Sequence, residues 1–218
     1  SALSDGMGTA DQCYTRSRYM YGYDFATLTD HEWFTGNMIL PSEWEWIKIV
    51  GRLNNSEPDF MTFAAYEWTS ARVPAGAGHK NVYFSDWDQP VFGLRTTAPR
   101  TPELFRMLKD HHAIAIPHHI GWTGVDWENH NEEVQPVFEI VSAHGAFEYM
   151  GNEPIMHRGG IKGHFVQDGL LKGLRFGLIG ASDGHGLLWH HGISRKEDEW
   201  ETGLAAVLVQ TRTREAIM

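Results

Sequence analysis

The chain carries seven carboxylate and imidazole side chains in short packets, and most of these packets directly follow a strand-like apolar run. In parallel barrels and open α/β sheets, the carboxyl ends of the strands meet on one side and carry the chemistry. Imidazole suits zinc, manganese and iron, and a carboxylate can bridge two cations. The spacing therefore predicts that these residues converge on a cluster of metal ions: Asp5, His31, Glu67, His79, His118, Asp183 and His185.

Helix start and stop signals divide the chain at regular intervals. Thr9 suits the N-cap of a first helix, and Gly22 suits its C-terminal end. Ser42 suits the N-cap of a second helix, and Glu45 completes a capping box with it. The expected helices cover residues 10–21, a segment from 43 onward, 102–110 with Thr101 as N-cap, and a segment from 213 onward.

Short apolar runs alternate with these helices. Such alternation indicates an α/β fold with a largely parallel sheet. His79 directly precedes its strand, and Asp5 has no strand before it. The other five candidate ligands come directly after a strand. The expected strands cover residues 24–29, 60–66, 81–84, 113–116, 137–141, 176–181 and 203–209.

At 218 residues, with no internal repeat or linker, the chain is expected to form one domain over residues 1–218. The helix expected from residue 213 is too short to persist alone. Since Asp5 also lacks a preceding strand, we expect the parent chain to continue at both ends.

Composition narrows the class of partner. A formal net charge of −10 makes nucleic acid an unlikely partner, because a nucleic-acid footprint needs clustered Lys and Arg. No run of about 18 apolar residues is present, so no membrane span is expected. The single Cys13 has no internal disulfide partner. It is compatible with a reducing compartment such as the cytoplasm, but compartment and oligomeric state stay open.

These packets, in this order, resemble the PHP family (polymerase and histidinol phosphatase). The family's opening motif is His-x-His-Thr/Ser-x-x-Ser-Asp-Gly, and residues 1–6 resemble the part that follows the histidine pair. Thr-Asp-His stands at 29–31, and the closing Asp-x-His stands at 183–185. The Glu and His residues of the intervening motifs match Glu67, His79 and His118. The resemblance implies a distorted seven-stranded β/α barrel, similar to a TIM barrel and here truncated at both ends.

The resemblance also implies how the ligands group. A first site uses the histidine pair, which this sequence lacks, with Glu67 and Asp183. A second site uses Glu67, His79 and His118, and a third uses Asp5, His31 and His185. The full-length protein is then expected to hold two or three divalent ions of zinc, manganese or iron. Without the histidine pair the chain is expected to hold the first ion poorly, which leaves activity of this form open.

The implied activity is that of a metal-dependent phosphoesterase, which attacks a small phosphorylated substrate with metal-activated hydroxide. Asp183 and Glu67 are the expected catalytic residues, and Lys80, His144 and Arg158 are expected to contact the substrate. The alternative is a non-catalytic metal-binding scaffold or sensor domain of a longer protein. A nuclease would share the site but needs a basic groove.

Two further residues belong near the expected ligands. His119 is a possible substitute for His118, and Asp30 is expected to orient a ligand.

Overall fold

The structure is a computed structural model that describes residues 3–71, 76–152, 160–185 and 203–218. Its helical segments are α1 (Ala10–Thr15), the π-helix η1 (Arg16–Met20), α2 (Pro41–Asn54), α3 (Thr101–Asp110), α4 (Ile120–Thr123), α5 (Val166–Leu171) and α6 (Arg214–Ile217). Its strands are β1 (Phe25–Ala26), β2 (Asp30–His31), β3 (Trp33–Phe34), β4 (Asn37–Met38), β5 (Met61–Thr62), β6 (Ala64–Thr69), β7 (His79–Phe84), β8 (Ala113–Pro117), β9 (Val137–Ser142), β10 (Gly145–Ala146) and β11 (Gly177–Gly180).

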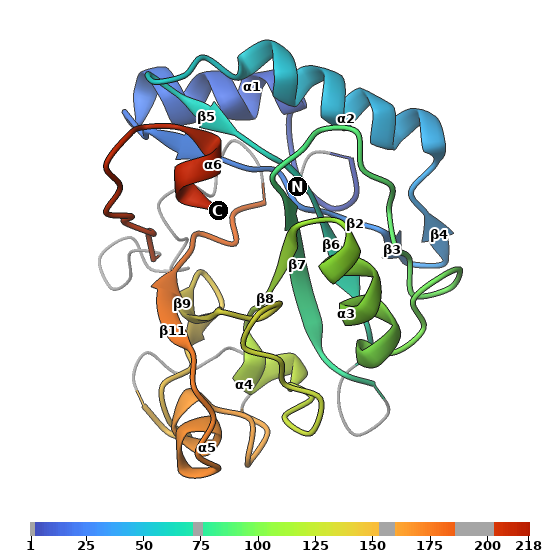
Figure 1. Ribbon diagram of the computed structural model, residues 1–218, viewed down its shortest axis with the longest axis vertical. Coiled ribbons are helices and arrows are strands. Elements are labelled where there is room, and N and C mark those ends of the chain that lie inside the picture. The colour runs from blue at the N-terminus through green and yellow to red at the C-terminus, as the bar shows by residue number, and fades with distance from the viewer. Residues whose placement is uncertain (1–2, 72–75, 153–159, 186–202) are drawn as a thin grey trace.

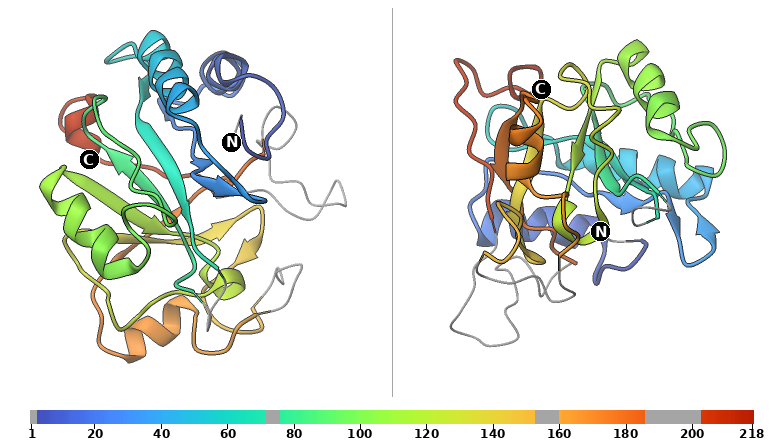
Figure 2. Two further views of the ribbon diagram at one scale, coloured as in Figure 1. Left: turned by 90° about the vertical axis from the view of Figure 1, so that its right-hand side faces the viewer. Right: turned by 90° about the horizontal axis from the view of Figure 1, so that it is seen from below.

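The strands form two main sheets. One has the order β2-β6-β7-β8 and the other has the order β10-β9-β11, while β1-β5 and β3-β4 are separate pairs. β8 lies beside β9, so the two main sheets are neighbours. In Figures 1 and 2, α1 and α2 lie at one end of the molecule and α5 lies at the other. The fold is mixed α/β, and the described strands do not close into a barrel.

The prediction of a largely parallel sheet is wrong for the described strands. β2 pairs with β6 in parallel, but β6–β7 and β7–β8 are antiparallel. A parallel connection needs about a dozen residues or more, usually including a helix. The connection from Thr69 to His79 is shorter than that, so the chain turns back as a hairpin.

The strand expected over 203–209 is also absent, although these residues are described. Leu204 and Leu208 are exposed, and Leu208 is fully so. Gly203 and Leu204 lie close to Gly180, but the exposed leucines do not pack into the core, so the described residues of this run add no strand to β11. The helix expected from residue 213 is confirmed as α6, where the Thr213 hydroxyl accepts a hydrogen bond from the Ala216 N–H.

The first helix matches its sequence signals. The Thr9 hydroxyl accepts from the Gln12 N–H, the Gln12 side chain accepts from the Thr9 N–H, and Gly22 has a φ of +67°. The second helix does not begin as expected. α2 begins at Pro41, and the Glu43 carboxylate accepts from the Leu40 N–H at 2.7 Å. Proline favours the first helical position, which explains why the predicted Ser42 cap is wrong.

Two apolar clusters flank the space between the main sheets. The larger cluster joins the four-stranded sheet to α2 and α3, and it includes Trp44, Ile47, Tyr66, Trp68, Val82, Phe84, Leu104 and Leu108. The smaller cluster lies around β9 and α5 and includes Ile120, Trp127, Phe138, Phe147 and Phe165. Each cluster packs against one main sheet and so stabilises the strands that carry the candidate ligands.

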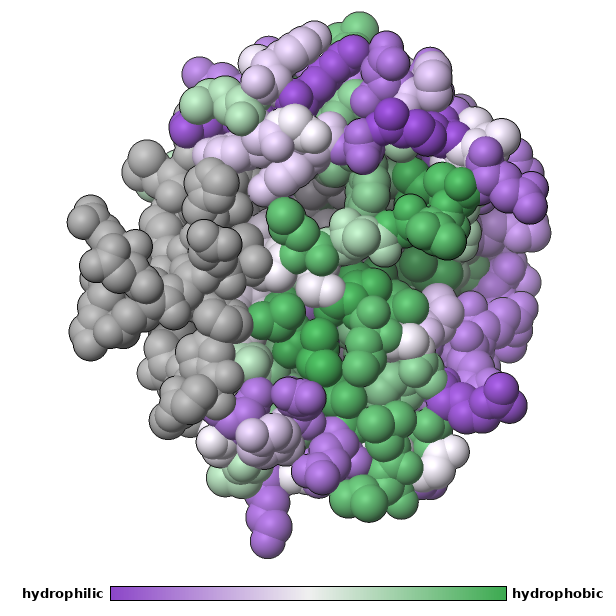
Figure 3. Space-filling model, turned by 90° about the vertical axis from the view of Figure 1, so that its left-hand side faces the viewer, coloured by the Kyte–Doolittle hydropathy of each residue, from purple (hydrophilic) through white to green (hydrophobic). Residues whose placement is uncertain are grey.

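Apolar side chains also gather on one outer face, which carries β11 and the C-terminal segment (Figure 3). Leu178, Leu204, Val207 and Leu208 are exposed. β11 is an edge strand of its sheet among the described strands. None of the helices in the described part of the chain is long and apolar enough to cross a membrane.

Candidate metal centre

Strand pairing brings three of the predicted ligands to one place. The parallel β2–β6 pair sets His31 opposite Glu67. The antiparallel β6–β7 ladder sets Thr69 opposite His79. Residues two apart on a strand share a face, so Glu67 and Thr69 face the same side as His79. The register therefore gathers His31, Glu67 and His79 on one face of the sheet.

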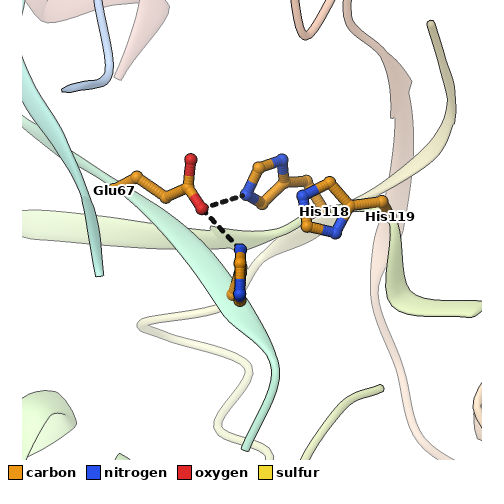
Figure 4. A group of neighbouring side chains, drawn as sticks. Glu67, His118 and His119 are labelled. Carbon is orange, nitrogen blue, oxygen red and sulfur yellow. Dashed lines mark ion pairs between the residues drawn. The ribbon is translucent and has the colours of Figure 1, made fainter. Parts of the chain in front are cut away.

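Glu67 is the centre of the first group of contacts (Figure 4). Its Oε1 lies 2.6 Å from His79 Nδ1, 3.2 Å from His31 Nδ1 and 3.4 Å from His118 Nε2. Only 5% of Glu67 is exposed, and His118 is 1% exposed. The structure thus brings together the Glu67–His79–His118 set that the family resemblance implies as its second site.

Asp183 is the centre of the second group. It follows β11 and has a backbone φ of +47°. Its Oδ2 lies 3.3 Å from His144 Nε2, 3.5 Å from His118 Nδ1 and 3.7 Å from His119 Nε2. His118 therefore lies between Glu67 and Asp183, with one ring nitrogen toward each carboxylate.

Asp5 connects the N-terminal segment to both groups. Its Oδ2 lies 3.3 Å from His31 Nε2 and 3.1 Å from His185 Nε2. The Asp30 carboxylate accepts from the N–H groups of Leu3 and Ser4, at 2.6 and 2.8 Å, and so holds the segment that carries Asp5. Asp5 therefore lies beside both other residues of the implied third site. Asp30 positions Asp5 through its hydrogen bonds to the preceding backbone.

The spacing of the donor atoms suits ligands of bound cations better than it suits direct hydrogen bonds between them. Glu67 Oε1, His79 Nδ1, both His118 ring nitrogens and Asp183 Oδ2 are buried, and none makes a hydrogen bond to a described residue. Two atoms that each lie about 2.1 Å from a tetrahedral ion are about 3.4 Å apart. Apart from the His79 contact, the imidazole–carboxylate distances run from 3.1 to 3.7 Å. Ligand atoms lie within 4.8 Å of one another in three sets: Glu67–His79–His118–His119, His144–Asp183–His185 and His118–Glu139–Asp183.

Electrostatics keep both carboxylates ionised. Burial alone would raise the pKa of Glu67, but the imidazoles of His118 and His31 outweigh it and hold this pKa well below its usual value. Burial likewise opposes ionisation of Asp183, yet His118 and its neighbours lower the pKa of this carboxyl. Burial lowers the pKa of His31, but the neighbouring carboxylates of Asp5 and Glu67 raise it to about 10. Both carboxylates are thus ionised, which is the form that binds a cation.

Two buried residues next to the cluster lie outside the three ligand sets that the resemblance implies: His119, expected only as a substitute for His118, and Glu139, which was given no role. Burial and the charge of His118 lower the pKa of His119, so its imidazole is neutral, which is the form that binds metal. Glu139 in β9 accepts from the His119 N–H at 3.2 Å, and burial raises the pKa of this carboxyl to about 8. The signal for Glu139 was a single carboxylate inside the apolar run at 137–141.

The three expected substrate contacts fare differently. Lys80 is fully buried on the opposite face of β7 from His79, its Nζ donates to the Ala77 carbonyl at 2.8 Å, and it lies over the Trp68 ring. Burial lowers the pKa of Lys80 to about 7. This placement argues against a substrate contact. His144 reaches the cluster through Asp183. Arg158 lies outside the described residues.

No protein-family model matches the sequence, and no curated protein matches it. The fold is similar to the crystal structure of a two-domain protein from Bacteroides vulgatus that contains a predicted PHP-like metal-dependent phosphoesterase, with a TM-score of 0.60 and 18% identity. The match covers 100% of this chain and 58% of that chain, so this chain spans less than two thirds of its structural neighbour. At this identity the likeness shows the fold alone. The PHP-like fold predicted from the motifs is therefore confirmed, as a mixed α/β architecture around buried clusters of His, Glu and Asp that could bind metal.

Proposed function

We propose that the chain is a metal-dependent phosphoesterase that hydrolyses small phosphorylated substrates at a site of two or three divalent cations. One observation carries the proposal. Two buried carboxylates, Glu67 and Asp183, lie on either side of His118, and further imidazoles surround each of them at distances that suit ligands of adjacent ions. The fold similarity to a protein that contains a predicted PHP-like phosphoesterase supports the same activity.

Zinc, manganese or iron bound there would supply Lewis-acid chemistry, which lowers the pKa of a water molecule and withdraws charge from phosphoryl oxygens. The protein's part is to hold the donor atoms. Glu67 would bridge two cations, while Asp183 and the imidazoles would complete their shells. No separate serine or cysteine nucleophile is needed, because the cations activate water directly.

The exposure of the ligands suggests the direction from which substrate enters. The His118 side chain is 1% exposed, whereas those of Asp5 and His185 are 20% and 27% exposed. The outer ligands therefore form the rim of the site and the inner histidine forms its floor. A phosphate group would approach across Asp5 and His185, since these are the more exposed of the compared ligands.

We also infer that residues 1–218 form one domain in which the two main sheets are parts of a distorted seven-stranded barrel. The position of β8 beside β9 supports this inference, because it makes the two sheets neighbours. The convergence of ligands from β2, β6, β7 and the segments after β8 and β11 supports it too, because barrel strands deliver their functional residues to one end.

Hydrolysis of p-nitrophenyl phosphate by the chain loaded with manganese or zinc tests the proposal. We expect Glu67→Gln and Asp183→Asn to reduce kcat/KM by at least about 100-fold, because each removes a charged ligand. Asparagine tolerates the left-handed backbone of Asp183. His112→Asn serves as the matched control, since His112 is exposed, has a φ of +47° and precedes β8 rather than following it.

The same preparations separate the phosphoesterase from a non-catalytic scaffold. Metal content measured by elemental analysis shows whether the site is loaded. Full loading without turnover on a panel of phosphomonoesters and phosphodiesters would reject the phosphoesterase and favour a metal-binding scaffold. Inhibition of a measured turnover by single-stranded DNA would instead point to a nuclease.

A further inference from the structure

Three imidazoles face one oxygen of Asp183, and two of them belong to none of the ligand sets implied by the motifs. We propose that His119 and His144 bind a divalent cation together with Asp183, as a subsite beside the Glu67–His79–His118 set. The inference rests on the metal-binding part of the proposed function and is independent of phosphoester hydrolysis.

Distances carry the first step. Asp183 Oδ2 lies 3.3 Å from His144 Nε2 and 3.7 Å from His119 Nε2, and it makes no hydrogen bond to a described residue. N–H···O hydrogen bonds are mostly 2.7–3.2 Å long, whereas two ligands of one tetrahedral ion are about 3.4 Å apart. The spacing therefore suits an ion between these atoms.

The backbone brings His119 into the cluster. In an extended strand, consecutive side chains point to opposite faces, so His119 should point away from His118. Instead His119 has φ +38° and ψ +43°, and its ring centroid lies 3.8 Å from that of His118 (Figure 4). Glu139 Oε1 accepts the His119 N–H and stabilises this left-handed turn. Such strained non-glycine residues concentrate at functional sites.

Neighbouring side chains orient both imidazoles. Thr123 Oγ1 lies 3.1 Å from His119 Nδ1, which leaves Nε2 directed at Asp183. A metal-binding histidine usually has its other ring nitrogen fixed in this way. The Trp122 ring packs against both histidines, with centroid distances of 4.9 Å to His119 and 4.6 Å to His144.

The donor set indicates the class of cation. Two imidazole nitrogens and one carboxylate oxygen suit zinc or cobalt better than magnesium or calcium, which prefer all-oxygen shells. Zn²⁺ and Co²⁺ are therefore the probes. Co²⁺ is useful because its visible absorption reports the ligand set without any measurement of turnover.

The test compares bound ions per chain in the wild type, His119→Asn, His144→Ala and the double variant, with His112→Asn as control. His112 and His119 both have positive φ and flank β8, so the same substitution is made in the same backbone conformation. We expect each single variant, and also the double variant, to bind one Zn²⁺ fewer than the wild type and to lose the share of the Co²⁺ absorption that this ion contributes. The control should match the wild type.

Thr123→Val provides a second route if the histidine variants fold poorly, as judged by far-UV circular dichroism. Removing the hydroxyl leaves both histidines in place but releases His119 Nδ1. We expect the affinity for one Zn²⁺ to fall by about 10- to 100-fold. Thr123→Val with unchanged affinity, or folded His119→Asn and His144→Ala with the wild-type number of ions, would overturn the proposal.

Turnover separates this inference from the proposed function. A chain that loses one ion in both histidine variants but hydrolyses no phosphoester would keep the subsite and reject the phosphoesterase. A chain that hydrolyses phosphoesters but keeps all its ions in both variants would reject the subsite alone.

Discussion

Left-handed backbone recurs at the residues that surround the cluster. His119 and Asp183 have φ values of +38° and +47°, a conformation that costs a non-glycine residue about 1–2 kcal/mol. Both side chains point into the same group of contacts. Gly78, one residue before His79, has a φ of +71° and packs directly against the Gly124 carbonyl. The cluster is therefore positioned by single residues whose conformations depend on their neighbours.

Gly78→Ala should destabilise the protein strongly, because its new methyl group would overlap the Gly124 carbonyl in addition to straining the backbone. Gly22→Ala is the matched control, since Gly22 has a similar φ of +67° and open space around it. We expect a loss of about 1 kcal/mol in the free energy of unfolding for Gly22→Ala and at least about 2 kcal/mol more for Gly78→Ala. Urea denaturation of both variants measures the difference, and equal losses would contradict the packing argument.

Lys80→Met should retain metal binding and stabilise the protein at low pH, because the methionine fills the same buried space without a charge. The folded-state pKa of Lys80 is about 7, below its unfolded value. The unfolded chain therefore binds the extra proton between pH 7 and about 10.4, and wild-type stability rises with pH across that window.

We expect a gain of about 1–3 kcal/mol for Lys80→Met at pH 6.5 that shrinks by pH 9. Denaturation at both pH values measures this change. A loss of turnover at unchanged stability would instead restore Lys80 as a substrate contact.

At the residue scale, motifs located the carboxylates and histidines that contact Glu67, Asp183 and Asp5, because most packets place a ligand-type residue next to a strand end. They could not place Lys80, whose orientation depends on which face of β7 is buried. They offered His119 only as a substitute for His118 and did not show that both side chains reach the cluster, because a single left-handed residue changes the direction of the His119 side chain and leaves no trace in sequence spacing.

At the scale of elements, helix signals were more informative than the strand pattern. The start of α1 and the strands that carry Glu67, His79 and His118 follow from the Thr9 cap and the apolar runs. However, a π-helix, η1, forms the second half of the first expected helix, and α3 begins at Thr101 after Arg100 rather than after a Thr101 cap. Whether neighbouring strands run parallel or antiparallel could not be predicted from the apolar runs, because the periodicity within one strand does not show how it pairs with another. The short connection before β7 was the available signal for an antiparallel pair.

Two cap substitutions test where the helices begin. Thr9→Ala removes the acceptor for the Gln12 N–H and should cost about 1 kcal/mol of unfolding free energy. Ser42→Ala should cost less than about 0.5 kcal/mol, because Ser42 is exposed and lies inside α2 after Pro41. Thermal denaturation distinguishes the two. A larger loss for Ser42→Ala would restore the Ser42 cap expected from the sequence.

At the scale of the whole molecule, the cluster links segments that backbone hydrogen bonds leave separate. Glu67 and His118 belong to the four-stranded sheet and the segment after it, Asp183 follows β11 of the three-stranded sheet, and Asp5 lies near the N-terminus. The sequence could not show that these two sheets are distinct, because its alternation of strands and helices is equally compatible with one continuous parallel sheet. Bound cations would therefore connect the two sheets.

Chelation should consequently lower the thermal stability of the protein. An ion that binds only the folded chain at 1,000 times its Kd adds about 4 kcal/mol, which corresponds to roughly 10 °C in Tm for a chain of this size. We expect EDTA to lower the Tm of the zinc-loaded chain and excess zinc to restore it. The double variant Glu67→Gln with Asp183→Asn is the control, and a similar EDTA effect on it would contradict this role.

The apolar outer face over β11 and the C-terminal segment affects how copies of the chain behave in concentrated solution. A net charge of −10 keeps copies apart at low ionic strength, where repulsion extends about 30 Å at 0.01 M salt. Added salt shortens the range of the electrostatic repulsion but does not weaken the hydrophobic attraction between exposed apolar patches. Light scattering should therefore detect growing particles as sodium chloride rises, and Leu208→Glu, which places a carboxylate on a fully exposed leucine, should slow that growth.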